Sequence, residues 1–273
     1  MTQSERRRFL IDYLIAEDAQ YAEIPIPDDE AEQKRLFRSL VNVREAKSAS
    51  SDFLRVQDEY LQEESRARGI VDAQTIFDST EQANARPPLY LWRGDITTLK
   101  IGAIVNAANS GLTGCYQPCH SCIDNAIHSA SGIQLRAECA AIMQQQGYAE
   151  PAGKAKITRA YNLPCDFVIH TVGPIVRGKL TERDCVQLAN CYKSCLAIAE
   201  KNGVGSIAFC CISTGVFHFP QERAAQIAFS SVKQWLSAHG GVIDRVIFNV
   251  FTDEDRDIYE KIFQQQGRKH QQT

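Results

Sequence analysis

Apolar and polar positions alternate at helical spacing through the first 87 residues. Apolar side chains recur three or four residues apart around Leu10, Leu40 and Tyr60, which predicts three amphipathic helices. The segment 24–28, Ile-Pro-Ile-Pro-Asp, separates the first two, because proline lacks the backbone N–H that a helix interior needs. Each helix needs a surface to cover its apolar stripe. We therefore expect this segment to pack on the rest of the chain, with a lid or a partner-docking surface as alternatives.

From Leu89 onward, short apolar runs alternate with longer amphipathic segments. The short runs predict strands and the longer segments predict helices. The predicted strands are 89–92, 103–105, 155–160, 167–171, 206–212 and 245–251, and the predicted helices are 123–146, 183–201, 221–238 and 253–265. This alternation is typical of an α/β domain with a largely parallel sheet that is covered on both faces.

The segment Arg86-Pro87-Pro88 separates these two regions, because a residue before proline favours extended chain. We therefore predict three parts along the sequence. They are an N-terminal helical extension at 1–87, an α/β domain at 88–266 and a polar C-terminal tail at 267–273.

Composition and charge narrow the class of partner. The 273 residues are 44% hydrophobic and 23% charged, with a formal net charge of −3, which is ordinary for a globular protein and disfavours a nucleic-acid partner. No apolar run reaches the roughly 18 residues of a membrane span, and the first residues lack the order of a signal peptide. We therefore expect a cytoplasmic protein without a membrane partner, whose ten cysteines are reduced and are partly packed in the core.

Three turns follow predicted strands, at 106–109, 172–174 and 213–217. The carboxyl ends of parallel strands share one edge of a sheet, where ligands of such folds bind, so we expect the turns to converge on a binding site. In the turn 213–217, Ser-Thr-Gly-Val-Phe, the glycine lets backbone N–H groups approach a phosphate and the hydroxyls add donors. An ordinary strand-to-loop turn explains the same residues.

Polar side chains near this edge have two interpretations each. Asn106 and Asn109 are separated by two alanines, which suits either turn chemistry or a polar wall whose small neighbours admit a ligand. Asp95 follows the first strand and precedes Ile96, where its carboxylate can cap the next turn or accept from an exocyclic amine such as that of adenine. These two uses of Asp95 are compatible.

The segment 115–122, Cys-Tyr-Gln-Pro-Cys-His-Ser-Cys, places three thiols and one imidazole just before the helix predicted at Ile123. Thiolate and imidazole are the ligands that zinc prefers, and a helix N-terminus favours anions, so the segment predicts a metal beside an anion-binding site. Asp124 and His128 lie four residues apart on one helix face, which suits a base and its orienting group. An ordinary hydrogen-bonded histidine is the alternative for His128.

Taken together, these motifs resemble the macrodomain, an ADP-ribose-binding fold. The resemblance rests on Gly94-Asp-Ile96, Ala103-Ile-Val-Asn-Ala-Ala-Asn109, Ile123-Asp-Asn-Ala-Ile-His128, His170-Thr-Val-Gly-Pro174 and Ile212-Ser-Thr-Gly-Val-Phe217, and it covers nearly the whole chain. More narrowly, the chain is similar to the zinc-dependent macrodomains of microbial protein-ADP-ribose hydrolases, the sirtuin-linked subgroup. In this subgroup cysteine and histidine replace a glycine-rich run, and a helical extension precedes the domain. The resemblance implies a three-layer α/β/α fold with a mostly parallel mixed sheet.

The resemblance also implies a role for each matching residue. Asp95 and Ile96 would contact adenine; Asn106 and Asn109 would face the distal ribose; Ser213, Thr214, Gly215, Val216 and Phe217 would wrap the diphosphate; Cys115, His120 and Cys122 would bind Zn²⁺; and Asn109, Asp124 and His128 would be catalytic. Cys119 departs from the subgroup's pattern. It either stays off the metal or completes a closed, structural site.

The function implied by the resemblance is zinc-dependent removal of mono-ADP-ribose from modified proteins, from Asp or Glu side chains. ADP-ribose and ADP-ribosylated protein would be its ligands, and a sirtuin-type ADP-ribosyltransferase and a lipoyl-carrier protein are plausible partners. The alternative is a non-catalytic ADP-ribose-binding module with a structural zinc. Asp124, His128 and the metal cluster argue against it, because a binding module needs only the residues that bind the ligand.

Overall fold

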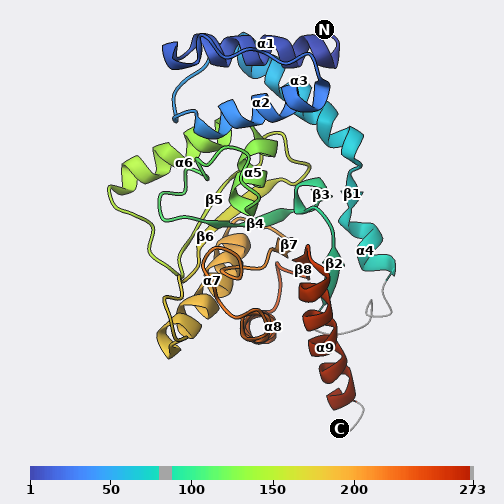
Figure 1. Ribbon diagram of the computed structural model, residues 1–273. Helices are drawn as coiled ribbons and strands as arrows, with labels where there is room; N and C mark the ends of the chain where they lie inside the picture. Colours follow the sequence, from blue (N-terminus) through green and yellow to red (C-terminus); the bar gives the residue numbers. More distant parts are fainter. Residues whose placement is uncertain (80–87, 271–273) are drawn as a thin grey trace.

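A six-stranded sheet forms the centre of the α/β domain (Figure 1). The computed structural model describes residues 1–79 and 88–270, the side chains of 266–270 excepted. The strand order is β2-β8-β7-β4-β6-β5, and every neighbouring pair is parallel except β5 with β6. The strands are β2 (Leu89–Arg93), β4 (Ala103–Ala108), β5 (Ala155–Arg159), β6 (Phe167–Val172), β7 (Ser206–Phe209) and β8 (Arg245–Val250). A separate parallel pair joins β1 (Val71–Asp72) to β3 (Leu99–Lys100).

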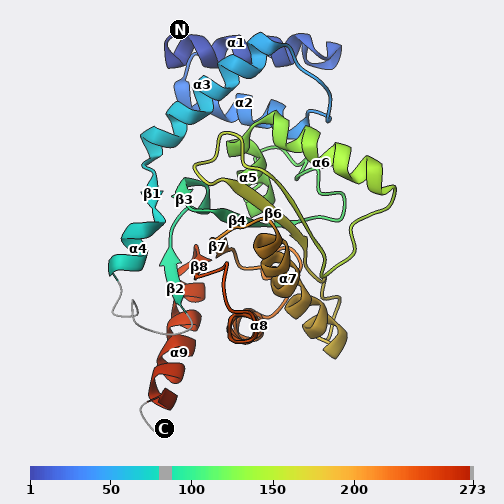
Figure 2. The ribbon, with the colours of Figure 1, turned by 180° about the vertical axis from the view of Figure 1, so that it is seen from behind.

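Helices cover both faces of the sheet, as Figures 1 and 2 show. One face carries α5 (Ile123–Ser131) and α6 (Ile133–Gln146), and the other carries α7 (Glu182–Lys201), α8 (Gln221–Ala238) and α9 (Asp253–His270). Central strands are therefore buried on both sides, and in β6 every residue after Phe167 is buried, including the polar His170 and Thr171. The predicted three-layer α/β/α macrodomain fold with a mostly parallel mixed sheet is confirmed.

The single helix predicted at 123–146 is instead two helices that meet at Gly132, so that prediction was wrong. Gly132 has a φ of +99°, a conformation that L side chains rarely adopt. A Cβ atom there would also lie 2.7 Å from Nε2 of Gln57 in the extension. Apolar spacing alone does not reveal such a break, because the periodicity resumes directly after the glycine.

Other element ends differ from the prediction as well. Strand β4 continues to Ala108, because its pairing with β6 continues to that residue. Asn106 therefore lies within a strand and not in the turn that follows it. Strand β7 ends earlier than predicted, at Phe209, and α9 continues past residue 265 to His270.

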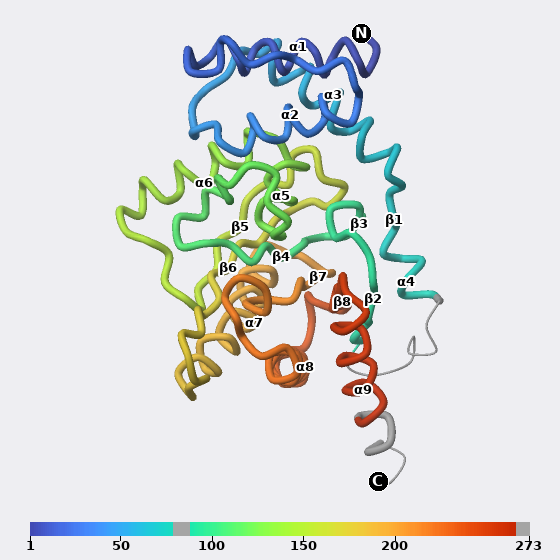
Figure 3. The backbone as a smooth tube through the Cα atoms, in the orientation of Figure 1, coloured from blue at the N-terminus to red at the C-terminus, as the bar shows by residue number. Residues whose placement is uncertain are grey.

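The N-terminal extension lies over α5 and α6, at the top of Figure 3. It consists of α1 (Gln3–Ala16), a short 3-10 turn (Ala19–Tyr21), α2 (Glu30–Val43), α3 (Ser51–Arg68) and, beside β2, α4 (Ala73–Ser79). The side chains of Thr2, Asp29 and Ser50 cap α1, α2 and α3.

A second, smaller core lies within this extension. Its buried residues are Leu10, Ile11, Leu14, Phe37, Leu40, Val41, Phe53, Val56, Tyr60 and Leu61, and Ile133 of α6 joins them. The predicted end of the extension falls largely on 80–87, and the predicted tail ends in 271–273, both outside the described residues. Within the described part, no helix is long and apolar enough to cross a membrane.

Candidate active site

A pocket of about 740 Å³ opens at the carboxyl edge of the sheet. Each of the three predicted turns contributes to its lining, through Asn109, Gly173 and the whole of 213–217, so the expected convergence is confirmed. Residues 114–116 and 120–124, the two ends of the cysteine-rich loop and the start of the helix after it, also line the pocket. Pockets of about 300–1,000 Å³ are typical of sites for small molecules and cofactors.

The turn 213–217 brings backbone close to the pocket. Ser213 has a φ of +66° and is buried, and its Oγ has no hydrogen-bond partner among the described residues. Gly173 lies directly beside it, since a Cβ on Gly173 would be 1.9 Å from that Oγ. A buried hydroxyl without a partner is costly, so a ligand that accepts from Ser213 would be favoured.

Asp95 and Ile96 line the far end of the pocket. The Asp95 carboxylate caps a 3-10 turn, η3 (Ile96–Thr98), by accepting from the backbone N of Thr97 at 2.9 Å. Its other oxygen pairs with Arg68 of the extension at 3.1 Å. The capping role is thus present, and Asp95 borders the pocket at the same time.

Sequence reasoning missed two lining residues from the end of β8. Phe251 is 73% exposed, and the Asn249 side chain donates to the carbonyl of Gly94 at 2.9 Å. Strand β8 pairs in parallel with β2 and β7, so its carboxyl end reaches the same edge as the other turns. The rule that located the three turns would also have located this one.

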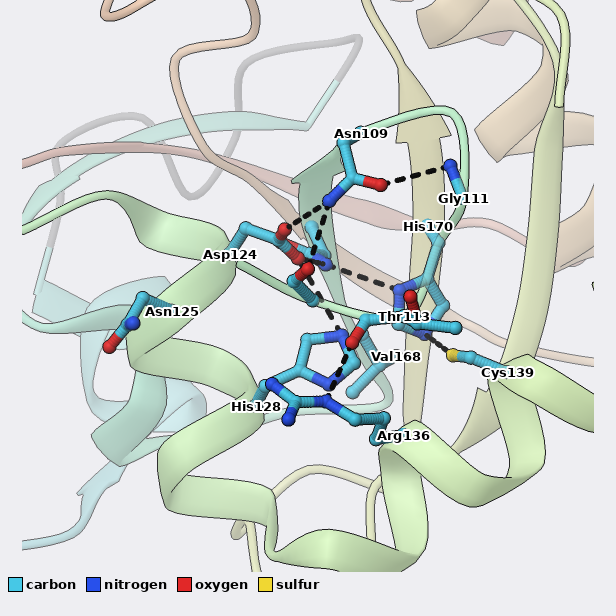
Figure 4. Close-up of polar contacts among 12 residues, drawn as sticks. Asn109, Gly111, Thr113, Asp124, Asn125, His128, Arg136, Cys139, Val168 and His170 are labelled. Carbon is cyan, nitrogen blue, oxygen red and sulfur yellow. Dashed lines mark hydrogen bonds and ion pairs between the residues drawn. The ribbon is translucent and has the colours of Figure 1, made fainter. Parts of the chain in front are cut away.

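Asp124 lies in the first turn of α5 and borders the pocket, although only 5% of it is exposed. Its two oxygens accept from Nδ2 of Asn106 at 2.8 Å and from Nδ2 of Asn109 at 3.2 Å (Figure 4). Burial raises the pKa of this carboxyl to about 6, against the amide hydrogen bonds, which lower it. Asn109 also donates to the carbonyl of Gly114 at 3.0 Å, so it links Asp124 to the start of the cysteine-rich loop.

Two predicted site residues lie behind Asp124 and are not among the residues lining the pocket. Asn106 is fully buried and contacts Nδ1 of His170 at 3.2 Å as well as Asp124. His128 is 3% exposed, and its Nε2 is 3.6 Å from Asp124 Oδ1, longer than a hydrogen bond. Burial holds the pKa of His128 well below its ordinary value, and the neighbouring His170 and Arg136 lower it further. The structure therefore places a neutral imidazole beneath the carboxylate.

Cys115, His120 and Cys122 come together at the pocket wall. One possible ligand atom of each residue lies within 4.8 Å of those of the other two, and all three side chains are partly exposed. Zinc bonds of about 2.3 Å to sulfur in tetrahedral geometry separate two sulfur ligands by about 3.8 Å, so small side-chain movements suffice. Burial raises the pKa of the Cys122 thiol to about 11, so the thiol keeps its proton. A bound metal would displace that proton. The donor set fits zinc.

Cys119 points away from these three residues. Its thiol donates to the carbonyl of Arg35 in α2 at 3.3 Å, and its backbone N donates to Oδ1 of Asn42 at 2.9 Å. Cys119 also has a φ of +51°, which turns the chain between the possible ligands Cys115 and His120. The alternative in which Cys119 completes a fourfold protein site has no support in this geometry.

A second cluster of possible ligands lies in the interior: His128, Cys139 and His170. All three residues are buried between the sheet and α5 and α6. Burial lowers the pKa of His170 to about 3 and raises the pKa of Cys139 to about 12. Both shifts favour the neutral side chains.

Comparison with known proteins identifies the family. The family model described as Macro domain matches residues 105–228. A protein-ADP-ribose hydrolase of Treponema medium is 57% identical over 262 residues, which span 96% of this chain and 99% of that protein. The chain belongs to the protein-ADP-ribose hydrolase family. As a member of this macrodomain family it is an enzyme, in agreement with the sequence prediction.

Two further relatives of this hydrolase-family chain bear on its ligand. The macrodomain of Trypanosoma brucei in complex with ADP-ribose superimposes with a TM-score of 0.62 at 30% identity, over 83% of this chain and 94% of that one. A probable bifunctional ADP-ribose hydrolase/ADP-ribosyltransferase of Fusarium oxysporum is 48% identical over 183 residues, which are 64% of this chain and 31% of that protein.

Proposed function

We propose that this protein is a zinc-dependent hydrolase that removes mono-ADP-ribose from modified protein side chains. One observation carries the proposal: Cys115, His120 and Cys122 open onto the same pocket as Asp124 and Asn109. A structural zinc is usually enclosed by four protein ligands, whereas catalytic sites keep one position open. The family and the T. brucei complex support ADP-ribose as the ligand.

The pocket offers a separate contact for each part of ADP-ribose. Asp95 and Ile96 at its far end would receive adenine, and the turn 213–217 would hold the diphosphate through backbone N–H groups and the free Ser213 hydroxyl. The distal ribose then lies beside Asn109 and the cysteine-rich loop. This grip would hold the anomeric carbon near Asp124, which converts binding energy into orientation.

Asp124 is the group placed to take a proton from the nucleophile. Amide donors from Asn106 and Asn109 fix both of its oxygens, so the carboxylate is oriented before the substrate arrives. Zinc held by Cys115, His120 and Cys122 would supply a Lewis acid that lowers the pKa of an oxygen at the reacting centre. His128, neutral and buried, supports Asp124 from behind and keeps water from that side.

Carboxylate-linked ADP-ribose is the substrate class that this arrangement favours. Of the three carboxylates among the described lining residues, Asp95 pairs with Arg68 and Asp255 accepts from Thr252, which leaves Asp124 at the loop. Glycosidases that protonate their leaving group use a second carboxyl group. An Asp or Glu leaving group departs as a carboxylate and needs no such acid.

The name of the F. oxysporum relative, which joins hydrolase and ADP-ribosyltransferase in one chain, supports a transferase as functional partner. We propose a sirtuin-type transferase in that place. A lipoyl-carrier protein as a further partner rests on the resemblance of the sequence to the zinc-containing subgroup. The non-catalytic alternative with a structural zinc would need a fourth protein ligand, and Cys119 is directed to Arg35 instead.

The test measures free ADP-ribose released from defined Asp/Glu-linked and Ser-linked substrates. Wild type is compared with Cys122→Ala and Asp124→Ala, and Cys119→Ala serves as the matched cysteine control. We expect Cys122→Ala and chelated wild type to bind ADP-ribose but to release almost none, and Cys119→Ala to stay active. Full activity of Cys122→Ala would refute a catalytic metal, and faster release from Ser-linked substrate would refute the carboxylate preference.

A further inference from the structure

The cysteine-rich loop is held by the N-terminal extension as well as by its own domain. Arg38 of α2 donates from Nη2 to the carbonyl of His120 at 2.9 Å and to Oδ1 of Asn125 at 2.7 Å, with Nε at 3.1 Å from the same oxygen. Asn125 in turn donates from Nδ2 to the carbonyl of Gln117 at 3.0 Å. One guanidinium therefore fixes two carbonyls of the loop, one directly and one through Asn125.

A second residue of α2 holds the middle of the loop. Asn42 is almost fully buried, and its Oδ1 accepts from the backbone N of Cys119 at 2.9 Å. Its Nδ2 donates to Oγ of Ser129 in α5 at 2.9 Å, so its side chain joins the loop to the helix that follows it. This contact fixes Cys119 itself, whose positive φ turns the chain just before the neighbouring His120.

The start of the loop, around Thr113 and Tyr116, is connected to α2 as well, through Arg136. Arg136 of α6 donates from Nε to the carbonyl of Thr113 at 2.7 Å, and from Nη1 to the carbonyls of Val41 and Asn42 at 3.0 and 2.9 Å. Its guanidinium also lies 4.3 Å from the ring centroid of Tyr116. The cation satisfies the free carbonyls at the C-terminus of α2 and holds that end against the loop.

We infer that α2 is part of the metal site, and that Arg38 and Asn42 are positioning residues for the three ligands. This inference rests on the proposed function, because it assumes that Cys115, His120 and Cys122 bind zinc. Without these contacts the loop must lose more conformational freedom when it binds the metal. Contacts that orient metal ligands typically change metal affinity by about 10- to 100-fold.

The test uses the full chain with Arg38→Ala and Asn42→Ala. Zinc affinity is measured by competition with a chromophoric chelator, and ligand geometry by the absorption bands of the Co²⁺-substituted protein. We expect about 10- to 100-fold weaker zinc binding and altered Co²⁺ bands in both variants. Arg38→Lys, which keeps one cationic donor, should restore part of the affinity.

Arg6→Ala is the matched control, since Arg6 pairs with Glu59 wholly within the extension at 3.1 Å. This pair joins α1 to α3, so the substitution perturbs the same extension without touching α2's contacts to the loop, and it should leave zinc affinity and the Co²⁺ bands unchanged. Wild-type affinity and bands in Arg38→Ala and Asn42→Ala would overturn the inference, and so would equal losses in Arg6→Ala. A wild-type protein that binds no zinc would instead overturn the proposed function, and the inference with it.

Discussion

Two clusters of cysteine and histidine lie near Asp124, one at the pocket and one in the interior, and they differ in burial and in access to the pocket. The outer cluster, Cys115, His120 and Cys122, is partly exposed on a loop and lines the pocket. The inner cluster, His128, Cys139 and His170, is buried beneath α5 and α6. Both bring their possible ligand atoms within 4.8 Å of one another, so proximity alone does not distinguish them.

Environment separates the two clusters. In the inner cluster Asn106 donates its amide, so Nδ1 of His170 accepts and the proton of that imidazole lies on Nε2, 3.0 Å from Oγ1 of Thr158. A metal would have to replace these contacts and deprotonate the buried Cys139 thiol, whose pKa is raised to about 12. The outer cluster faces the pocket, where a metal can enter and meet a substrate. We conclude that the inner residues support Asp124, through Asn106, while the outer ones suit a metal.

The largest expected effect is the difference in zinc content and kcat/KM between variants that lack one cysteine of the outer or of the inner cluster. Cys115→Ala should lose stoichiometric zinc and about 100-fold or more of kcat/KM, because a Lewis acid contributes several kcal/mol to the transition state. Cys139→Ala should keep its zinc and most of its activity, because it removes a buried thiol whose polar contact, 3.7 Å to Nε2 of His170, does not reach Asp124. The measurements that test this difference are the metal content after dialysis and the kcat/KM of both variants. Zinc loss in Cys139→Ala would mean that the inner cluster also binds metal.

Asn106→Ala tests whether the inner cluster supports Asp124. The substitution removes one of the two amide donors to the carboxylate, and we expect kcat to fall about 10- to 100-fold with little change in KM, as is typical of a misplaced general base. Thr158→Val, which acts on the far side of His170, should lower kcat less. Separate measurement of kcat and KM provides the test, and a change confined to KM would place Asn106 in substrate binding.

The sequence identified the outer cluster more readily than the inner one. Cys115, His120 and Cys122 are neighbours in the chain, so their spacing is visible, and the strand–helix alternation predicted the sheet edge that they face. His128, Cys139 and His170 come from α5, α6 and β6, and only the fold brings them together.

Burial was the other quantity that the sequence did not contain. His128 shares a helix face with Asp124, as predicted, but the packing of α6 and β6 turns that face into the interior. Asn106 was expected in a turn, whereas the length of β4, set by its pairing with β6, places it in the sheet. Side-chain direction in both cases depends on contacts between distant segments.

Acid sensitivity of folding should come from the inner cluster. The pKa of His170 is about 3 in the folded protein, and that of His128 is also lowered, against about 6.5 in an unfolded chain. Between these values the unfolded state binds protons that the folded state excludes. The contribution of these two histidines to the free energy of unfolding is therefore complete above about pH 6.5. It decreases as the pH falls, by up to about 1.4 kcal/mol per pH unit for each histidine.

The variant His128→Leu isolates one of these contributions, because neither ring nitrogen of His128 has a hydrogen-bond partner among the described residues. Urea unfolding from pH 8 to pH 4.5 should show a shallower loss of stability than in wild type. The matched histidine control is His239→Gln, at an exposed position outside the cluster. If His128→Leu keeps the full slope, the imidazole is not held neutral.

The smallest expected effect concerns Gly132, which separates α5, capped by Cys122, from α6, which carries Cys139. At φ +99° and ψ 172°, a region that only glycine adopts readily, Gly132→Ala should destabilise the fold by about 1–3 kcal/mol, with the approach to Gln57 adding to the strain. Zinc affinity should change little, because the outer ligands all precede the break and are held by α2 and the first turn of α5. Urea unfolding tests the expected loss of stability, and chelator competition on the same preparation tests the unchanged zinc affinity. A large drop in zinc affinity would show that the two clusters are mechanically coupled through this glycine.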